Sequence, residues 1–356
     1  MKDKILVFEY FTASGQKDEC IISEAEALII SLLNDLKNFD VDLIINESFE
    51  YIAEAYENVN PIVIKEDVID YLEKNASNFD KAIFIAAEND NNLYRITKIL
   101  EDADVFIYNS NSQAAFNTSD KFVMYELLED IVYQPKTFKF KIDPKGYWKR
   151  AVENLYESWE NETNQDNLSI IIKPVNGVDC EDIVILDDIN DLSYDLEEIF
   201  PPGSRILVQE FIEGEDVSVS LIVKDKKAIP ISLNKQFVSL DNNKAIYLGG
   251  ELPYNCKSKN EAIIMAINAC QYLDGLKGFV GVDLRITPEG EVYLLEINSR
   301  FTTPYVGLQK IAISDIAEDI INLVDDDIDL KDKIQLSGSV KFEKVKDNLV
   351  IEEFKQ

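Results

Sequence analysis

The stretch YLLEINSRF, residues 293–301, combines an apolar strand pattern with polar side chains at every second position. Side chains two residues apart on a strand share one face and stand roughly 7 Å apart. Glu296, Asn298 and Arg300 therefore place a carboxylate, an amide and a guanidinium on one face, while the other face is apolar. The pattern raises the question of which ligand lies against the polar face.

A second apolar run, residues 279–286, carries Asp283 and Arg285 on one face by the same alternation. The turn signal Pro–X–Gly at 288–290 lies between the two runs and predicts an antiparallel hairpin. Asp283 would then face Glu296 and Asn298, and three oxygen ligands of this kind suit Mg²⁺ or Mn²⁺ beside nucleotide phosphates. Alternation alone fits a half-exposed hairpin with polar outer residues equally well.

Lysines and a strand connection give two further signals. Lys173 ends the strand IIIKP before a loop with Asn176 and Gly177, a pattern suited to holding a phosphate, although a strand-end lysine can also reach into water. Lys121 opens a helix over 121–128 and, taken alone, is equally a surface lysine. The run QEFIEGED, residues 209–216, joins two strands. It either presents backbone groups to a base and Asp216 to a ribose hydroxyl, or forms an acidic hairpin turn.

Composition limits the function classes. The 356 residues are enough for two or three compact units. Lys and Arg number 35 and Asp and Glu 67, so the net charge of −32 argues against nucleic acid and membrane partners. The chain has no histidine, which excludes Ser–His–Asp and Cys–His catalysis and His-ligated zinc. Four scattered cysteines without CxxC spacing, and no apolar run long enough for a membrane span, lead us to expect a cytoplasmic protein.

The first third of the chain alternates short apolar runs with amphipathic segments, which predicts a parallel sheet covered by helices. Ligands bind such sheets beyond the carboxyl ends of the strands, here residues 10–15, 88–90 and 109–112. An N-cap signal at 117–120 precedes the helix over 121–128 and marks the first boundary. The expected strands are 5–8, 41–45, 62–64, 82–86 and 105–108, and the expected helices are 23–36, 67–74 and 93–101.

Mixed strands and helices follow, with a polar surface loop at 160–167, a solvated turn at 325–333 and a final hairpin. The expected strands are 136–141, 168–173, 206–211, 217–223, 229–233, 246–248, 279–286, 292–299, 338–343 and 349–354, and the expected helices are 147–159, 259–273 and 314–324. The fold class is therefore mixed α/β, with three expected domains at 1–117, 118–208 and 209–356.

The order of these motifs resembles the ATP-grasp superfamily of carboxylate–amine ligases, over nearly the whole chain. The resemblance implies an ATP-grasp fold behind a Rossmann-like N-terminal domain, a small lid subdomain at 118–208 and a catalytic subdomain at 209–356. It also implies ATP and two Mg²⁺ or Mn²⁺ ions as cofactors. Members of the family are often dimers, so a homodimer is an expectation.

The resemblance also implies roles for individual residues. Asp283, Glu296 and Asn298 would hold the metal ions, and Arg300 and Lys173 would act on the transferring phosphoryl group. The nucleotide would contact a larger set: Lys121, Lys173, Gly177, Glu210, Phe211, Ile212 and Asp216.

FEYFTASG at 8–15, AEND at 87–90 and EINSRFTTPYVGL at 296–308 point to a narrower group. They resemble the ligases that join the γ-carboxylate of L-glutamate to the amine of tyramine in methanofuran biosynthesis. Glu88 or Asp90 would then take an ammonium and Arg300 a carboxylate, although Asn89 or Asp90 could equally cap the next helix. The substrate residues expected are Ser14, Glu88, Asn89, Asp90, Asn234, Gln236, Arg300, Thr302 and Thr303.

The chain departs from the family pattern at two places. Gly281 stands where many members have an arginine, and the loop 176–180 has a single glycine where members often have several. Two other functions stay open: a ligase for a different acid–amine or dipeptide pair, and a non-catalytic nucleotide-binding protein of the same fold.

Overall fold

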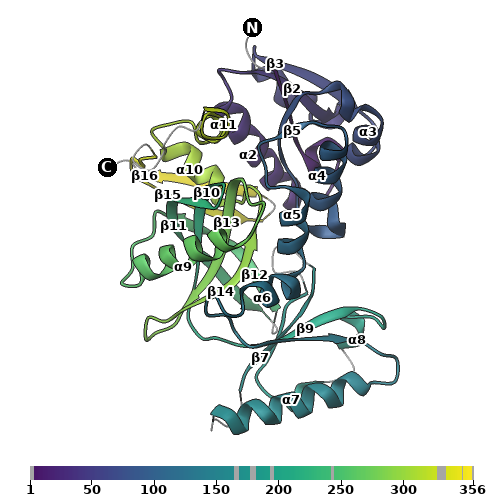
Figure 1. Cartoon of the computed structure of the whole chain (residues 1–356), viewed down its shortest axis with the longest axis vertical. Helices are drawn as coiled ribbons and strands as arrows, with labels where there is room; N and C mark the ends of the chain where they lie inside the picture. The colour runs from purple at the N-terminus through teal and green to yellow at the C-terminus, as the bar shows by residue number, and fades with distance from the viewer. Residues whose placement is uncertain are drawn as a thin grey trace.

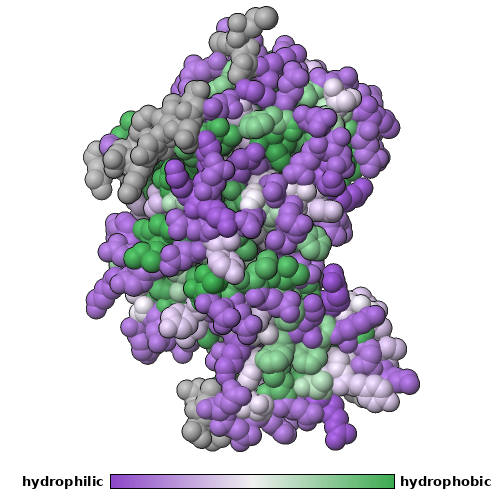
Figure 2. All heavy atoms as spheres, viewed as in Figure 1, coloured by the Kyte–Doolittle hydropathy of each residue, from purple (hydrophilic) through white to green (hydrophobic). Residues whose placement is uncertain are grey.

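The computed structural model describes residues 4–163, 168–176, 182–192, 196–241, 244–326, 334–346 and 348–354. Figure 1 shows an N-terminal sheet with its helices at the top, a second sheet in the middle, and a small lobe carrying α7 (Tyr147–Thr163) at the bottom. Figure 2 shows mainly hydrophilic side chains on the viewed face, in keeping with the net charge of −32. Among the described helices, none combines the length and the apolar character that a membrane crossing requires.

The N-terminal sheet has five strands in the order β3-β2-β1-β4-β5, and all of their pairings are parallel. This confirms the predicted strand–helix alternation, because parallel neighbours need crossover connections. Alternate residues of β1 enter different cores: Ile5 and Val7 pack with α2, while Leu6 and Phe8 pack with α3 and α4. The elements are β1 Lys4–Glu9, α1 Tyr10–Ser14, α2 Glu19–Asp35, β2 Asp40–Asn46, η1 Glu47–Ala55, β3 Val59–Ile64, α3 Val68–Asn75, η2 Ala76–Asn78, β4 Lys81–Ile85, η3 Asn89–Asn91, α4 Asn92–Asp102 and β5 Phe106–Ile107.

The second sheet has eleven strands, and its larger part is antiparallel in the order β14-β13-β10-β11-β12. The final hairpin, predicted from the sequence, joins this sheet through β12 and β15. One face packs on α9 and the other on α10, α11 and the N-terminal helix α2. The elements are β10 Glu215–Lys224, β11 Lys227–Asp241, β12 Lys244–Leu252, α9 Lys259–Tyr272, β13 Gly278–Ile286, β14 Val292–Asn298, α10 Pro304–Ile311, α11 Ile316–Asp326, β15 Ser339–Val345 and β16 Asn348–Phe354.

The small lobe continues the same sheet in the order β8-β7-β9-β6, and in the described part of the chain Val184 of β8 pairs with Lys244 of β12. In the core of this lobe, Trp148 and Val152 of α7 pack against Ile172 of β7 and Ile206 of β9. The elements are β6 Thr137–Lys141, α7, β7 Ile170–Pro174, β8 Val184–Leu186, η4 Ile189–Asp191, α8 Leu196–Ile199 and β9 Arg205–Glu210.

Two helices, α5 (Ser112–Ser119) and α6 (Lys121–Leu128), connect the N-terminal sheet to the small lobe. The predicted N-cap signal at 117–120 is only partly correct. Asp120 does cap α6, because its Oδ1 accepts from the backbone N–H groups of Phe122 and Val123 at 3.1 Å. Residues 117–119 are instead the last three residues of α5. The sequence did not reveal this helix, because it is short and weakly amphipathic.

Other differences are local. The sequence did not indicate α10, β8 or α8, which are short. The predicted surface loop at 160–167 starts too early, because α7 continues to Thr163, and residues 164–167 lie outside the described residues. Asp325 belongs to α11 rather than to a turn, and 327–333 also lie outside them. The expected domain boundaries at 117 and 208 remain predictions.

A buried polar cluster ties α2 to α10 and α11 beneath the second sheet. Asp35, 1% exposed, accepts from the Tyr305 hydroxyl at 2.7 Å and from the Ala317 backbone N–H at 3.0 Å. Burial raises the pKa of Asp35 to about 6, although both hydrogen bonds favour the ionised form. The cluster therefore holds a carboxyl group whose ionisation is linked to folding.

The Asp35→Asn variant should become more stable relative to the parent as the pH rises. The folded-state pKa lies above the unfolded value, so between about pH 4 and pH 6 only the folded parent keeps the proton. Protonation of Asp35 therefore stabilises the folded parent at low pH, and this stabilisation is lost as the pH rises through that window. Asparagine does not titrate, so the variant has no such pH dependence. We expect the stability difference between variant and parent to shift by about 2 kcal/mol between pH 4.5 and pH 7.5 in urea unfolding. A difference that stays constant with pH would contradict the assignment.

Candidate functional site

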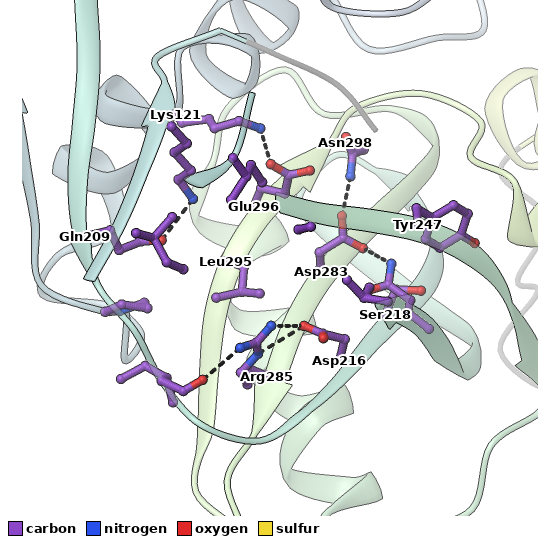
Figure 3. Close-up of a pocket in the computed structure, with 18 of the residues that line it drawn as sticks. Lys121, Gln209, Asp216, Ser218, Tyr247, Asp283, Arg285, Leu295, Glu296 and Asn298 are labelled. Carbon is purple, nitrogen blue, oxygen red and sulfur yellow. Dashed lines mark hydrogen bonds and ion pairs between the residues drawn. The ribbon is translucent and has the colours of Figure 1, made fainter. Parts of the chain in front are cut away.

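A cavity of about 360 Å³ lies between the small lobe and the second sheet, within the size range of small-molecule sites. Figure 3 shows Lys121, Glu296 and Asn298 at one end, Arg285 and Asp216 at the other, and Leu295 between them. The end near Arg285 also has Phe211 and Ile212 in its wall, because the guanidinium contacts both, whereas charged side chains lie at the first end. Its described lining comprises Lys121, Pro135, Ile171, Lys173, Pro174, Ile183, Ile185, Gln209, Glu210, Phe211, Ile212, Gly214, Asp216, Ser218, Gln236, Val238, Ala245, Tyr247, Asp283, Arg285, Leu295, Glu296, Asn298, Arg300, Thr302, Thr303 and Pro304.

The predicted carboxylate hairpin is present, with Asp283 of β13 paired to Glu296 of β14. The turn closes through a 2.9 Å hydrogen bond from the Gly290 N–H to the Thr287 carbonyl. Asp283 accepts from the Asn298 side-chain amide at 2.9 Å through one oxygen and from the Gln236 amide at 2.9 Å through the other. The side-chain oxygen of Asn298 is therefore left available to a ligand.

Burial and the neighbouring Glu296 raise the pKa of Asp283. Burial opposes ionisation of Glu296 too, but Lys121 and Lys173 hold its pKa below the usual range. A buried carboxylate pair beside an amide oxygen is a donor set that fits a hard divalent cation. Among the described residues no third carboxylate, cysteine or histidine joins them, so most of the coordination sphere would come from the ligand or water.

The two predicted lysines converge from different elements. Lys121 forms an ion pair with Glu296, and its backbone N–H donates to the Val175 carbonyl at 3.1 Å, which joins α6 to the end of β7. Lys173, 6% exposed, donates to Gln209 Oε1 at 2.9 Å, and Gln209 donates onward to the Thr137 hydroxyl at 2.7 Å. Both ammonium groups thus lie beside the carboxylate pair. Gly177, predicted to contact the nucleotide, lies outside the described residues.

The run 209–216 connects the small-lobe strands of the second sheet to its antiparallel part and is not a hairpin turn. β9 pairs with β6 and β7, whereas β10 pairs with β11 and β13. Glu210, Phe211, Ile212 and Asp216 all line the cavity, and their contact with a nucleotide remains a prediction. Gly214 permits this connection, because a Cβ there would lie 2.2 Å from the Ile286 carbonyl oxygen.

Arg300 lies at the far end of β14 and connects the cavity to the N-terminal part. Its Nε donates to Glu88 Oε2 at 2.7 Å, and both side chains are largely buried. Glu88 Oε1 is buried and accepts no hydrogen bond from the described residues. Glu88, Lys121, Glu296 and Asn298 also line a small cavity of about 10 Å³ next to the main one.

The remaining predicted substrate residues divide into two groups. Gln236, Thr302 and Thr303 line the cavity, although Thr303 also donates to Glu24. The described wall does not include four others: Ser14, Asn89, Asp90 and Asn234.

Local contacts account for this second group. Ser14 accepts from the Val68 N–H at 3.4 Å, and Asn234 is fully buried between Ser218 and Ser220. The alternative role of Asn89 or Asp90 as a helix cap is not observed, because neither η3 nor α4 has a side-chain cap. The backbone instead turns through left-handed conformations at Asp90 and Asn91.

The sequence analysis assigned no role to several residues that line the cavity: Gln209, Ser218, Tyr247, Arg285 and Leu295. The alternation placed Arg285 on the face of Asp283 but gave no partner for it. The departure at Gly281 has a steric reason, because a Cβ there would lie 2.9 Å from the Thr302 methyl group. No side chain fits at that position without a shift of Thr302.

Comparisons with known proteins agree on one family. The family model described as ATP-grasp domain matches residues 118–304. The chain is 34% identical to the tyramine–L-glutamate ligase of Methanocaldococcus fervens, covering 86% of this chain and 89% of that protein. It is 32% identical to the enzyme of the same name from Methanocaldococcus jannaschii, covering 86% and 84%. A solved structure, a putative ATP-grasp superfamily protein from Archaeoglobus fulgidus, superposes with a TM-score of 0.71 at 23% identity and covers 99% of both chains.

Proposed function

Because the chain belongs to the ATP-grasp family of carbon–nitrogen ligases, we propose that it joins L-glutamate to tyramine using ATP. The products would be γ-glutamyltyramine, ADP and phosphate, in a step of methanofuran biosynthesis. The observation that carries the proposal is the 34% identity to a tyramine–L-glutamate ligase over 86% of this chain. The convergence of Lys121, Lys173, Asp283, Glu296 and Asn298 in one cavity supports it.

The proposed reaction has two steps. The γ-carboxylate of glutamate attacks the γ-phosphate of ATP, which releases ADP and leaves an acyl phosphate. The amine of tyramine then attacks the acyl carbon and displaces phosphate. Lys121, Lys173 and Arg300 would hold the transferring group, so the protein acts by positioning and by stabilising charge rather than by a covalent intermediate of its own.

Asp283, Glu296 and Asn298 would hold the two Mg²⁺ or Mn²⁺ ions of the proposal, which neutralise the phosphate charge when bound. The apolar lining near Phe211 and Ile212 would take the base. These roles follow from the donor chemistry and from the position of each group along the cavity.

The substrate end of the proposal rests on Arg300 and Glu88. The Arg300 guanidinium is suited to a carboxylate or an acyl phosphate, and the unpaired Oε1 of Glu88 is suited to an ammonium group. A homodimer and a cytoplasmic location remain predictions.

A substrate screen tests the proposal directly. Phosphate release should require both L-glutamate and tyramine, and the product mass should equal that of the two substrates less one water. A runner-up is a ligase for another acid–amine or dipeptide pair, and phosphate release with a different pair but not with tyramine would favour it. A non-catalytic binding function is set aside, because the chain belongs to a family of ligases.

Glu88→Gln should raise the Michaelis constant for the substrate ammonium by about tenfold and leave that for ATP nearly unchanged. Glutamine can still accept from Arg300, so the variant removes charge rather than shape. A matched control is Asp102→Asn, which also removes a paired carboxylate, because Asp102 pairs with exposed Lys98 at the end of α4. Parental kinetics of Glu88→Gln for both glutamate and tyramine would remove Glu88 from the site.

A further inference from the structure

An ion pair lies at the apolar end of the cavity, between two neighbouring strands. Arg285 of β13 and Asp216 of β10 are directly opposite in the antiparallel register. Their side chains are 14% and 17% exposed, and both line the cavity. Neither the metal set nor the phosphate lysines include Arg285, so its role is unassigned.

The hydrogen bonds of this pair are asymmetric. Arg285 donates to Asp216 Oδ1 through Nε at 3.0 Å and also through a terminal nitrogen, so one oxygen takes both bonds. Within the described chain no hydrogen bond reaches Oδ2 of Asp216, which therefore remains an acceptor for a ligand. Figure 3 shows the two dashed lines from Arg285 meeting at the same oxygen of Asp216.

Arg285 also fixes the connection between β9 and β10. Its other terminal nitrogen donates to the Ile212 carbonyl at 2.8 Å, and the guanidinium lies 5.4 Å from the centre of the Phe211 ring. Each nitrogen of the guanidinium thus donates to a protein oxygen. Because its nitrogens already donate to protein oxygens, the Arg285 side chain is suited to positioning other groups and not to binding phosphate.

We propose that Arg285 is a positioning residue for the ribose of the bound nucleotide. It clamps Asp216 so that Oδ2 accepts from the ribose hydroxyl groups, and it thereby makes the cavity select ribonucleotides. The inference rests on the proposed function in one respect, namely that the cavity binds ATP.

Electrostatics explains why the clamp has to be a cation. An unpaired Asp216 would oppose the approach of a triphosphate in a cavity that already contains Asp283 and Glu296. Paired with Arg285, Asp216 keeps its acceptor oxygen while the pair carries no net charge. A rival interpretation is that Arg285 obstructs the site of the base and must move before a nucleotide enters. It predicts that Arg285→Met binds ATP more tightly than the parent.

The test is calorimetric titration of the whole protein, with magnesium and without substrates, against ATP and 2′,3′-dideoxyATP. The parent should bind ATP at least about tenfold more tightly than the dideoxy analogue. The analogue lacks the ribose hydroxyl groups and therefore loses their hydrogen bonds to the Asp216 carboxylate. Arg285→Met should weaken ATP binding about tenfold and bring the preference for ATP below about threefold. Arg285→Lys keeps the positive charge but loses the planar set of guanidinium donors, so its preference for ATP over the dideoxy analogue should also fall. This variant provides the test if Arg285→Met folds poorly.

Lys235→Met is the matched control. Lys235 pairs at 3.2 Å with Glu215, the neighbour of Asp216, and does not belong to the described cavity wall. This variant should retain both the affinity for ATP and the preference over the dideoxy analogue.

A double-variant cycle separates positioning from direct contact. Asp216→Asn should lower the preference by itself, and adding Arg285→Met should change it little further, because one residue acts through the other. Independent, multiplying effects would overturn the proposal, as would tighter ATP binding or an unchanged preference in Arg285→Met. A parent that fails to bind ATP would overturn the proposed function instead.

Discussion

Glu296→Gln should lower kcat by about a thousandfold, equivalent to roughly 4 kcal/mol of transition-state stabilisation, while the protein stays folded. Glu296 forms an ion pair with Lys121 and lies opposite Asp283 in the hairpin. Glutamine keeps the shape and still accepts from Lys121, but it removes the negative charge proposed to hold the cations. The dependence of the residual rate on magnesium concentration should shift upward as well.

The control for this variant lies on the same hairpin. Glu291 is exposed at the start of β14 and is not part of the described cavity wall, so Glu291→Gln should keep the parental rate. Circular dichroism and thermal unfolding establish that Glu296→Gln is folded. Near-normal phosphate release by a folded Glu296→Gln protein would show that the hairpin does not bind the cations.

The hairpin could be predicted because its information is local. Period-2 alternation fixes which side chains share a face, and a Pro–X–Gly turn fixes which strands pair. Asp283, Glu296 and Asn298 therefore met as expected, and the parallel N-terminal sheet followed in the same way from strand–helix alternation.

Contacts between distant segments could not be predicted in this way. Arg300 pairs with Glu88 across 212 positions, and Arg285 with Asp216 across 69. No alternation or turn signal encodes such pairs, because they depend on which strands become neighbours and on how the N-terminal part lies against the second sheet. The N-cap of the helix 121–128 was predicted correctly, but the sequence could not single out Asp120, because four successive polar residues each resemble a cap until the preceding helix is known.

The cavity resolves the apparent conflict between an acidic chain and an anionic ligand. The net charge is −32, yet each cavity cation is held by a specific partner: Lys121 by Glu296, Lys173 by Gln209, Arg285 by Asp216 and Arg300 by Glu88. Lys173 donates to the neutral amide oxygen of Gln209, and its charge helps to keep the pKa of Glu296 below the usual range.

Lys173→Ala should raise the Michaelis constant for ATP by about 10- to 100-fold and leave that for glutamate nearly unchanged. Lys173 is 6% exposed and is aimed by Gln209 toward the carboxylate hairpin, so its loss removes a charge-assisted contact proposed for the phosphates. Such contacts contribute about 1.5–3 kcal/mol, which corresponds to that range of affinity. Initial rates at saturating glutamate and tyramine, with ATP varied, give the measurement.

Stability has to be separated from binding in this experiment, because the substitution also leaves Gln209 Oε1 without its donor. That loss costs about 1–3 kcal/mol of folding free energy, so unfolding curves must accompany the kinetics. Lys227→Ala is the matched control, since Lys227 is exposed at the turn that begins β11. If both substitutions changed the Michaelis constant for ATP equally, the end of β7 would not be a nucleotide-binding strand. A selective effect of Lys173→Ala would instead place the phosphates between β7 and the hairpin, where Lys121, Lys173, Asp283 and Glu296 line one cavity.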